Sequence, residues 1–166
     1  MKIDILFLDN DLSDHEEYFD NQTIKEYCET HSFEGEKNQI LSVPPSYSKS
    51  QNLTFLVGLG ENKVDNNFYD IGTLIGSKIK SDAEIKFLNF EEEKNLIIDG
   101  ILYVQYKFNN YKSEDDSSIN NITFKDIDSS VNEIKKDSVF WVRDLINTPA
   151  LDKSPEEFID KVKELV

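Results

Sequence analysis

The sequence predicts an α/β fold in which helices flank a mostly parallel or mixed central sheet. Short apolar segments typical of strands alternate along the chain with longer segments whose apolar residues recur at helical spacing. No internal repeat and no low-complexity tract interrupts this order. Strands that alternate with helices are typical of a layered α/β architecture.

Five segments are predicted to be strands. Residues 2–8 alternate Ile3, Ile5 and Phe7 with mainly polar positions, as expected of a largely buried strand. Residues 52–59 are the clearest strand, because they form an apolar run that ends at Gly60. An earlier strand ends at Pro44, because proline has no backbone N–H to donate to a neighbouring strand. The predicted strands are 2–8, 39–43, 52–59, 84–90 and 122–127.

Five helices are predicted between and after these strands. Asp65 is placed as the N-cap of one helix. Residues 94–107 are assigned to another helix because the apolar segment is too long for a strand, although Gly100 is unfavourable inside a helix. Ser154 and Glu157 form a capping box around a last helix that begins at Pro155. The predicted helices are 23–31, 65–80, 94–107, 130–147 and the segment from residue 155 onward.

The composition indicates one domain with an appendage at most, because the chain has 166 residues. Leu, Ile, Val and Phe make up about 31% of it, above the roughly 20% below which disorder is expected. The formal net charge of −15 produces a field that repels phosphates and anionic lipid. We therefore expect neither nucleic acid nor a membrane as a partner.

The amino-terminal segment and the single cysteine bear on the compartment. The apolar start is interrupted by Asp4 and Asp9, which argues against a signal peptide, and no window approaches the length of a membrane span. Cys28 alone cannot form an internal disulfide or seed a thiolate metal site. The cytoplasm is the expected compartment.

Three local patterns suggest a site, and each has a structural alternative that we favour. Gly58, Leu59 and Gly60 follow a predicted strand, which is where a phosphate-binding turn would lie. The third glycine of the dinucleotide fingerprint is missing and the residues that follow are acidic, so we favour a tight turn without a ligand. Residues 9–20 resemble a calcium loop without its central glycine, so a solvated acidic loop is expected. Cys28 and His31 lie one helical turn apart, and we interpret them as a core thiol and a surface imidazole.

Four segments together resemble a known family in their order along the chain. Residues 141–150 read Trp-Val-Arg-Asp-Leu-Ile-Asn-Thr-Pro-Ala and are followed by Ser-Pro-Glu-Glu-Phe at 154–158. Upstream lie Phe-Leu-Val-Gly-Leu-Gly at 55–60, Asp-Gly-Ile-Leu at 99–102 and Tyr-Lys-Phe-Asn-Asn-Tyr-Lys-Ser at 106–113. This series resembles the amino-terminal, non-catalytic half of the leucyl (cytosol) aminopeptidases.

The resemblance implies a macro-domain-like mixed sheet with a C-terminal linker helix. Residues 1–150 would be the amino-terminal domain, and residues 151–166 the linker and the start of a catalytic domain. Enzymes of this family hold two divalent metals, zinc or manganese, with Lys, Asp and Glu side chains of the catalytic domain. The chain has neither the glycine-rich run with the catalytic lysine nor the Asn-Thr-Asp-Ala-Glu-Gly-Arg signature, so both are expected beyond Val166.

This chain is therefore expected to carry no catalytic, cofactor-binding or metal-ligating residue, while its full-length parent is an aminopeptidase. Its expected partners are its own catalytic domain and neighbouring subunits, because the family implies a hexamer. The candidate interdomain or assembly residues are Phe140, Trp141, Arg143, Asn147 and Pro149.

The helix that carries these residues is apolar around most of its circumference from Val139 to Val142, so one core cannot cover it all. The alternative is that residues 155–166 fold back over it. Arg143, the only arginine, is expected to pair with Asp144 and orient the following turn. The alternative function is a free-standing macro-like module that binds a nucleotide or an ADP-ribose-type ligand.

Overall fold

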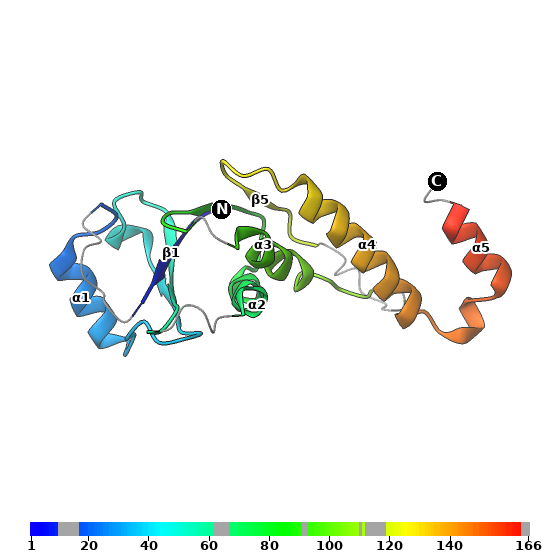
Figure 1. Ribbon diagram of the computed structural model, residues 1–166, viewed down its shortest axis with the longest axis horizontal. Coiled ribbons are helices and arrows are strands. Elements are labelled where there is room, and N and C mark those ends of the chain that lie inside the picture. Colours follow the sequence, from blue (N-terminus) through cyan, green and yellow to red (C-terminus); the bar gives the residue numbers. More distant parts are fainter. Residues whose placement is uncertain (10–16, 62–66, 91–92, 110, 112–118, 164–166) are drawn as a thin grey trace.

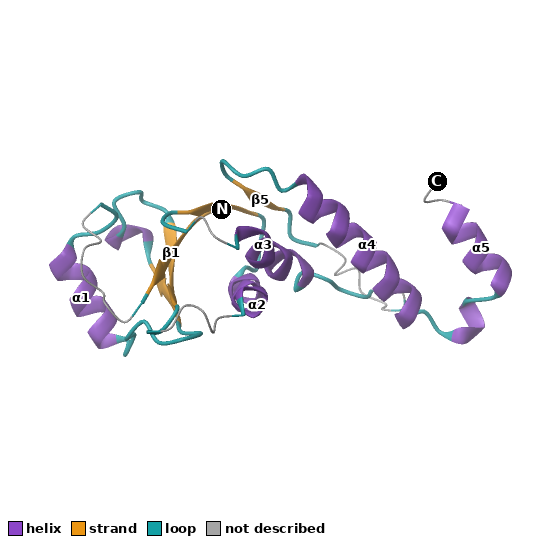
Figure 2. Cartoon of the chain, in the orientation of Figure 1, coloured by secondary structure: helices purple, strands orange, loops and turns teal. Residues whose placement is uncertain are grey.

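The protein is an elongated α/β molecule in which layers of secondary structure follow one another along the long axis (Figure 1). The computed structural model describes residues 1–9, 17–61, 67–90, 93–109, 111 and 119–163. One helix covers one side of a central sheet, two helices cover the other side, and two further helices extend away from the sheet (Figure 2). The predicted α/β class is confirmed.

The sheet has five strands in the order β2-β3-β1-β4-β5. β1, β3, β4 and β5 are parallel, and β2 pairs with β3 in the antiparallel direction, so the sheet is mixed. The parallel strands are linked by helical segments, as connections between parallel strands require. The strands are β1 Lys2–Leu8, β2 Ile40–Val43, β3 Leu53–Gly58, β4 Ala83–Phe87 and β5 Ile122–Phe124.

All five predicted helices are present, and their ends follow local capping chemistry. Asp20 caps the first helix, because its side chain accepts a hydrogen bond of 3.1 Å from the amide of Thr23. The predicted cap Asp65 lies outside the described residues. The helices are α1 Asn21–Thr30, α2 Phe68–Lys78, α3 Lys94–Tyr103, α4 Ser130–Asn147 and α5 Pro155–Lys163, and two short 3-10 turns are η1 Pro45–Tyr47 and η3 Ala150–Asp152.

Three predicted elements end three or more residues earlier in the structure than predicted. β4 ends at Phe87, and Asn89 continues the pairing with its side chain: its amide group donates to the Phe7 carbonyl (2.7 Å) and accepts from the Phe7 amide (2.9 Å). β5 ends at Phe124, just before Asp126 adopts a φ of 61°. α3 ends at Tyr103, before the predicted position 107.

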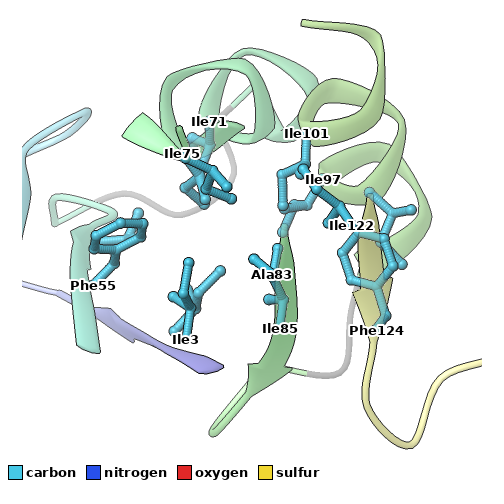
Figure 3. Close-up of a cluster of buried hydrophobic side chains, with 14 of the residues drawn as sticks. Ile3, Phe55, Ile71, Ile75, Ala83, Ile85, Ile97, Ile101, Ile122 and Phe124 are labelled. Carbon is cyan, nitrogen blue, oxygen red and sulfur yellow. The ribbon is translucent and has the colours of Figure 1, made fainter. Parts of the chain in front are cut away.

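The main core lies between the sheet and the α2–α3 pair (Figure 3). Alternate strand residues face it, as the twofold period of a strand requires. A smaller core forms on the other face, where α1 packs over β2, β3 and β1 through Leu6, Leu8, Ile24, Val43 and Leu56. The labelled side chains of the main core are Ile3, Phe55, Ile71, Ile75, Ala83, Ile85, Ile97, Ile101, Ile122 and Phe124.

Glycines let α2 and α3 approach each other closely. A Cβ added at Gly72 would overlap the carbonyl oxygen of Ile97, and one added at Gly100 would overlap the carbonyl oxygen of Tyr69. Gly100, which weakens the sequence-based helix assignment, is therefore a packing position within α3. Among the described residues, no helix is both long and apolar enough to cross a membrane.

Candidate interdomain surface

α4 is attached to α3 near its start by a partly buried polar cluster. The side-chain amide of Asn132 donates to Asp99 (2.7 Å) and to the carbonyl of Asn95 (3.0 Å). Lys135 approaches the other oxygen of Asp99 at 3.4 Å. Asn132 is 2% exposed, so its hydrogen bonds are shielded from water. The cluster determines which face of α4 points toward the domain.

A second contact attaches the end of α4 to the segment after α3. The hydroxyl of Tyr106 donates to Asp144 (2.8 Å) and accepts from the side-chain amide of Asn147 (3.0 Å). The ring of Phe140 meets the ring of Tyr106 edge-on at 5.1 Å between centroids. Burial raises the pKa of Tyr106, and its hydrogen bond to Asp144 raises it further. Tyr106 is therefore a neutral donor at physiological pH.

Arg143 completes this contact in a way that the sequence did not predict. Its guanidinium donates to the carbonyl of Tyr103 (2.9 Å) and lies 5.3 Å from the ring centroid of Tyr106. Among the described residues no ion pair joins Arg143 to Asp144, so the predicted local pair is wrong. The carboxylate of Asp144 is positioned instead by Tyr106.

The candidate interdomain residues divide into two groups by where they lie. Phe140, Arg143 and Asn147 contact the segment 103–106 of their own domain. Trp141 is half-buried, and Pro149 is exposed in the turn after α4. The structure thus brings three of the five together around Tyr106 and leaves the other two at the side or end of the helix.

The opposite side of α4 carries an apolar face that the sequence interpretation missed. Val131 is 62% exposed, Ile134 68%, Val142 46% and Ile146 71%. At the 3.6-residue period of a helix, positions 131, 134, 142 and 146 fall on one side of α4. Asn132 and Phe140 lie on other sides of the helix. The run 139–142 shares only Val142 with this face, whose wider helical spacing was also readable in the sequence. We call these four residues the α4 apolar face.

α5 has exposed apolar residues of its own and does not cover α4. It lies apart from α4 beyond η3 (Figure 1), so its described residues 155–163 do not fold back over α4 as the alternative expected. The predicted capping box is confirmed, because Ser154 and Glu157 exchange amide-to-side-chain hydrogen bonds of 2.8 and 3.2 Å. The exposed apolar residues of this region are Leu151, Phe158, Ile159 and Val162.

The glycine turn after β3 has no free amides for a phosphate. The amide of Gly58 donates to Gln39 (2.8 Å), and that of Gly60 donates to Gly35 (2.9 Å). A Cβ at Gly58 would overlap the carbonyl oxygen of Glu36. The turn is therefore a packing site for the loop before β2, as the preferred tight-turn interpretation predicted.

Cys28 and His31 make separate contacts rather than a reactive pair. Cys28 is 3% exposed, and burial raises the pKa of its thiol to about 11. His31 uses Nδ1 at 2.8 Å from the Tyr27 carbonyl and stacks on the Tyr27 ring at 4.1 Å. Most of the calcium-like loop lies outside the described residues. No group of three His, Cys, Asp or Glu side chains in the described part of the chain is arranged to hold a metal.

The sequence matches no profile of a known protein family and no characterised protein. The fold, by contrast, is similar to solved structures. A variant of tomato leucine aminopeptidase superimposes with a TM-score of 0.70 at 14% identity, over 99% of this chain and 39% of that one. Cytosol aminopeptidase from Coxiella burnetii gives 0.67 at 20% identity, over 99% and 35%.

A third similar structure is the bottromycin maturation enzyme BotP, with a TM-score of 0.72 at 14% identity over 99% of this chain and 36% of that one. BotP has also been solved in complex with manganese, and that structure gives a TM-score of 0.68. The chain spans only 35% to 39% of the length of these solved structures. The resemblance is thereby confirmed for the fold: the chain has the α/β fold of the amino-terminal domain of leucine and cytosol aminopeptidases.

Proposed function

We propose that this chain is the non-catalytic amino-terminal domain of a cytoplasmic, two-metal leucyl aminopeptidase. In this proposal residues 1–150 form the domain and residues 151–166 lead into a catalytic domain. That catalytic domain holds two zinc or manganese ions and removes amino-terminal residues from peptides. The chain itself contributes to subunit assembly and to access to the active site.

The α4 apolar face is the observation that carries this proposal. It leaves Val131, Ile134, Val142 and Ile146 exposed on the side of α4 that points away from its own domain. Each aliphatic side chain of this kind contributes about 1.5–3 kcal/mol when it is fully buried, so an unoccupied face of this size favours a partner. This chain spans only 39% and 35% of the two similar aminopeptidase structures, which supports a catalytic domain as that partner.

The test is to clone the coding sequence through and past the codon for Val166 and to express both lengths. Each protein is assayed for hydrolysis of leucine p-nitroanilide with added Mn²⁺ or Zn²⁺. We expect the longer protein to turn over and to bind metal, and the 166-residue chain to do neither, since its described residues offer no metal cluster.

Two results would contradict the proposal. One is metal-dependent turnover by the 166-residue chain alone. The other is a coding sequence that continues without any Lys, Asp and Glu ligand set for two metals. A longer protein whose turnover persists after Val142→Asp and Ile146→Asp, with unchanged oligomeric state, would contradict the assembly role only.

A further inference from the structure

The face of the sheet that α1 packs against is covered over only part of its width. α1 buries Leu6, Leu8 and Leu56, which lie toward the β2 side of the sheet and the carboxyl end of β1. On β1 and β4, and directly after β5, this same face carries the polar side chains of Lys2, Asp4, Glu84, Lys86 and Lys125. No described helix covers this part of the sheet, and it is hollowed.

The hollow has a volume of about 490 Å³, which is the size of a small-molecule site. We call it the lysine cavity. Among the described residues, four lysines line it against three carboxylates, although the whole chain has 18 basic and 33 acidic residues. The charged lining residues are Lys2, Lys49, Lys86, Lys125, Asp4, Glu17 and Glu84.

Strand register brings two of these lysines next to each other. Ile85 of β4 is the register partner of Phe124 of β5, and the amide of Lys125 donates to the Ile85 carbonyl at 2.8 Å. Lys86 on β4 and Lys125, the first residue after β5, therefore lie next to each other, and both line the cavity. Like charges at facing positions of a sheet are destabilising unless an opposite charge lies between them.

Within the described part of the chain, no carboxylate pairs with Lys2, Lys86 or Lys125. Strand register places Glu84 beside Lys2 and Asp4 beside Lys86. Asp4 is 3% exposed at the base of the cavity. One oxygen of this carboxylate accepts from Ser50 (2.5 Å) and Asn52 (3.1 Å), which attaches the loop before β3 to the sheet as a wall of the cavity. Part of the capacity of Asp4 is thus used by neutral donors rather than by the lysines.

Hydroxyl groups line the same wall. Ser48 and Ser50 are joined by a hydrogen bond of 2.8 Å, and the Tyr18 hydroxyl donates to the Leu88 carbonyl at 3.1 Å. These hydroxyls already donate within the protein, so the ammonium groups of Lys2, Lys86 and Lys125 are the donors that remain for phosphate oxygens.

We propose that the lysine cavity binds a small phosphorylated anion, with Lys86 and Lys125 as its main contacts and Lys2 at the rim. A compact diphosphate group fits better than an acidic protein segment, because the positive groups gather in one hollow and the rest of the surface is strongly acidic. The proposal is independent of the aminopeptidase assignment. The cavity is also separate from the glycine turn at residues 58–60.

The experiment is a titration of the 166-residue chain with inorganic pyrophosphate at low ionic strength. Binding is measured by calorimetry and by amide chemical shifts in NMR. We expect saturable binding and shifts centred on β4 and β5. Lys86→Gln and Lys125→Gln should each weaken binding about fivefold, and Lys78→Gln on α2, across the sheet, less than about twofold. Thermal unfolding of each variant verifies that the fold is intact.

Three outcomes would overturn the proposal. The first is no saturation with millimolar pyrophosphate. The second is binding that Lys78→Gln weakens as much as Lys86→Gln, which would mean a diffuse response to charge. The third is tighter binding of a hexaglutamate peptide than of pyrophosphate, with the same lysine dependence, which would assign the cavity to an acidic protein partner. Citrate should bind more weakly than pyrophosphate.

Discussion

Tyr106 and Asp144 are joined by a hydrogen bond of 2.8 Å that attaches the segment after α3 to the last turns of α4. The same Tyr106 hydroxyl accepts from Asn147, so one oxygen atom holds two residues of α4 that are nearly one helical turn apart. The bond links positions 38 residues apart in sequence. It shows that the end of α4, which leads toward α5, is held by its own domain.

Tyr106→Phe should lower the free energy of unfolding by about 0.5–1.5 kcal/mol, because it removes a hydroxyl that serves as both donor and acceptor. Urea denaturation followed by circular dichroism measures the change. Tyr111→Phe is the matched control, since the Tyr111 hydroxyl also donates to a carboxylate, that of Asp152 at 2.8 Å, but its side chain is 54% exposed. An equal loss in both variants would contradict the structural role of Tyr106.

Gly100→Ala should destabilise the protein by about 1–3 kcal/mol, the usual cost of overpacking. A methyl group there would overlap the Tyr69 carbonyl and force α2 and α3 apart. The sign is informative, because glycine to alanine in an ordinary helix interior stabilises by about 0.5–1 kcal/mol. Ser77→Ala on the exposed side of α2 serves as the control and should change little. A stabilised Gly100→Ala variant would show that the two helices are not closely packed.

Cys28 should make stability depend on pH in the alkaline range. Burial raises the pKa of its thiol from 9.0 to about 11 in the folded chain. The neutral thiol is the form that folding favours, so this contribution is fully present below pH 9 and is lost as the pH rises through about 11. The alkaline loss of stability should be smaller in Cys28→Ala. Identical pH profiles of the two proteins, or rapid labelling of the native thiol at neutral pH, would contradict the buried placement.

The α4 apolar face should cause the isolated chain to self-associate as its concentration rises, because exposed aliphatic groups on one helix side remain in water in the monomer. Val142→Asp and Ile146→Asp should shift the equilibrium toward the monomer in analytical ultracentrifugation without lowering the thermal midpoint. Leu74→Asp, at a 37% exposed position of α2, is the control and should leave association unchanged. A chain that stays monomeric at millimolar concentration would refute this prediction.

Local chemistry made several elements predictable from the sequence alone. The predicted limits of 130–147 are those of α4, and Ser154 caps α5 with Glu157 as the capping box requires. β1 and β3 were readable because buried strands of a mostly parallel sheet are short apolar runs. Signals of this kind extend over only a few residues, so they can be recognised in a single sequence.

Tertiary structure decided which side of each element meets a partner. The sequence by itself determined the α/β class, the strong acidity and the resemblance that the fold comparison confirms. Only the packed chain decided that Arg143 contacts Tyr103 and Tyr106 rather than Asp144, and that Gly100 is a close helix contact. Register likewise placed Lys86 beside Lys125, which lie 39 positions apart in sequence. Such relationships depend on the balance of many contacts between distant segments, and no short stretch of sequence encodes that balance.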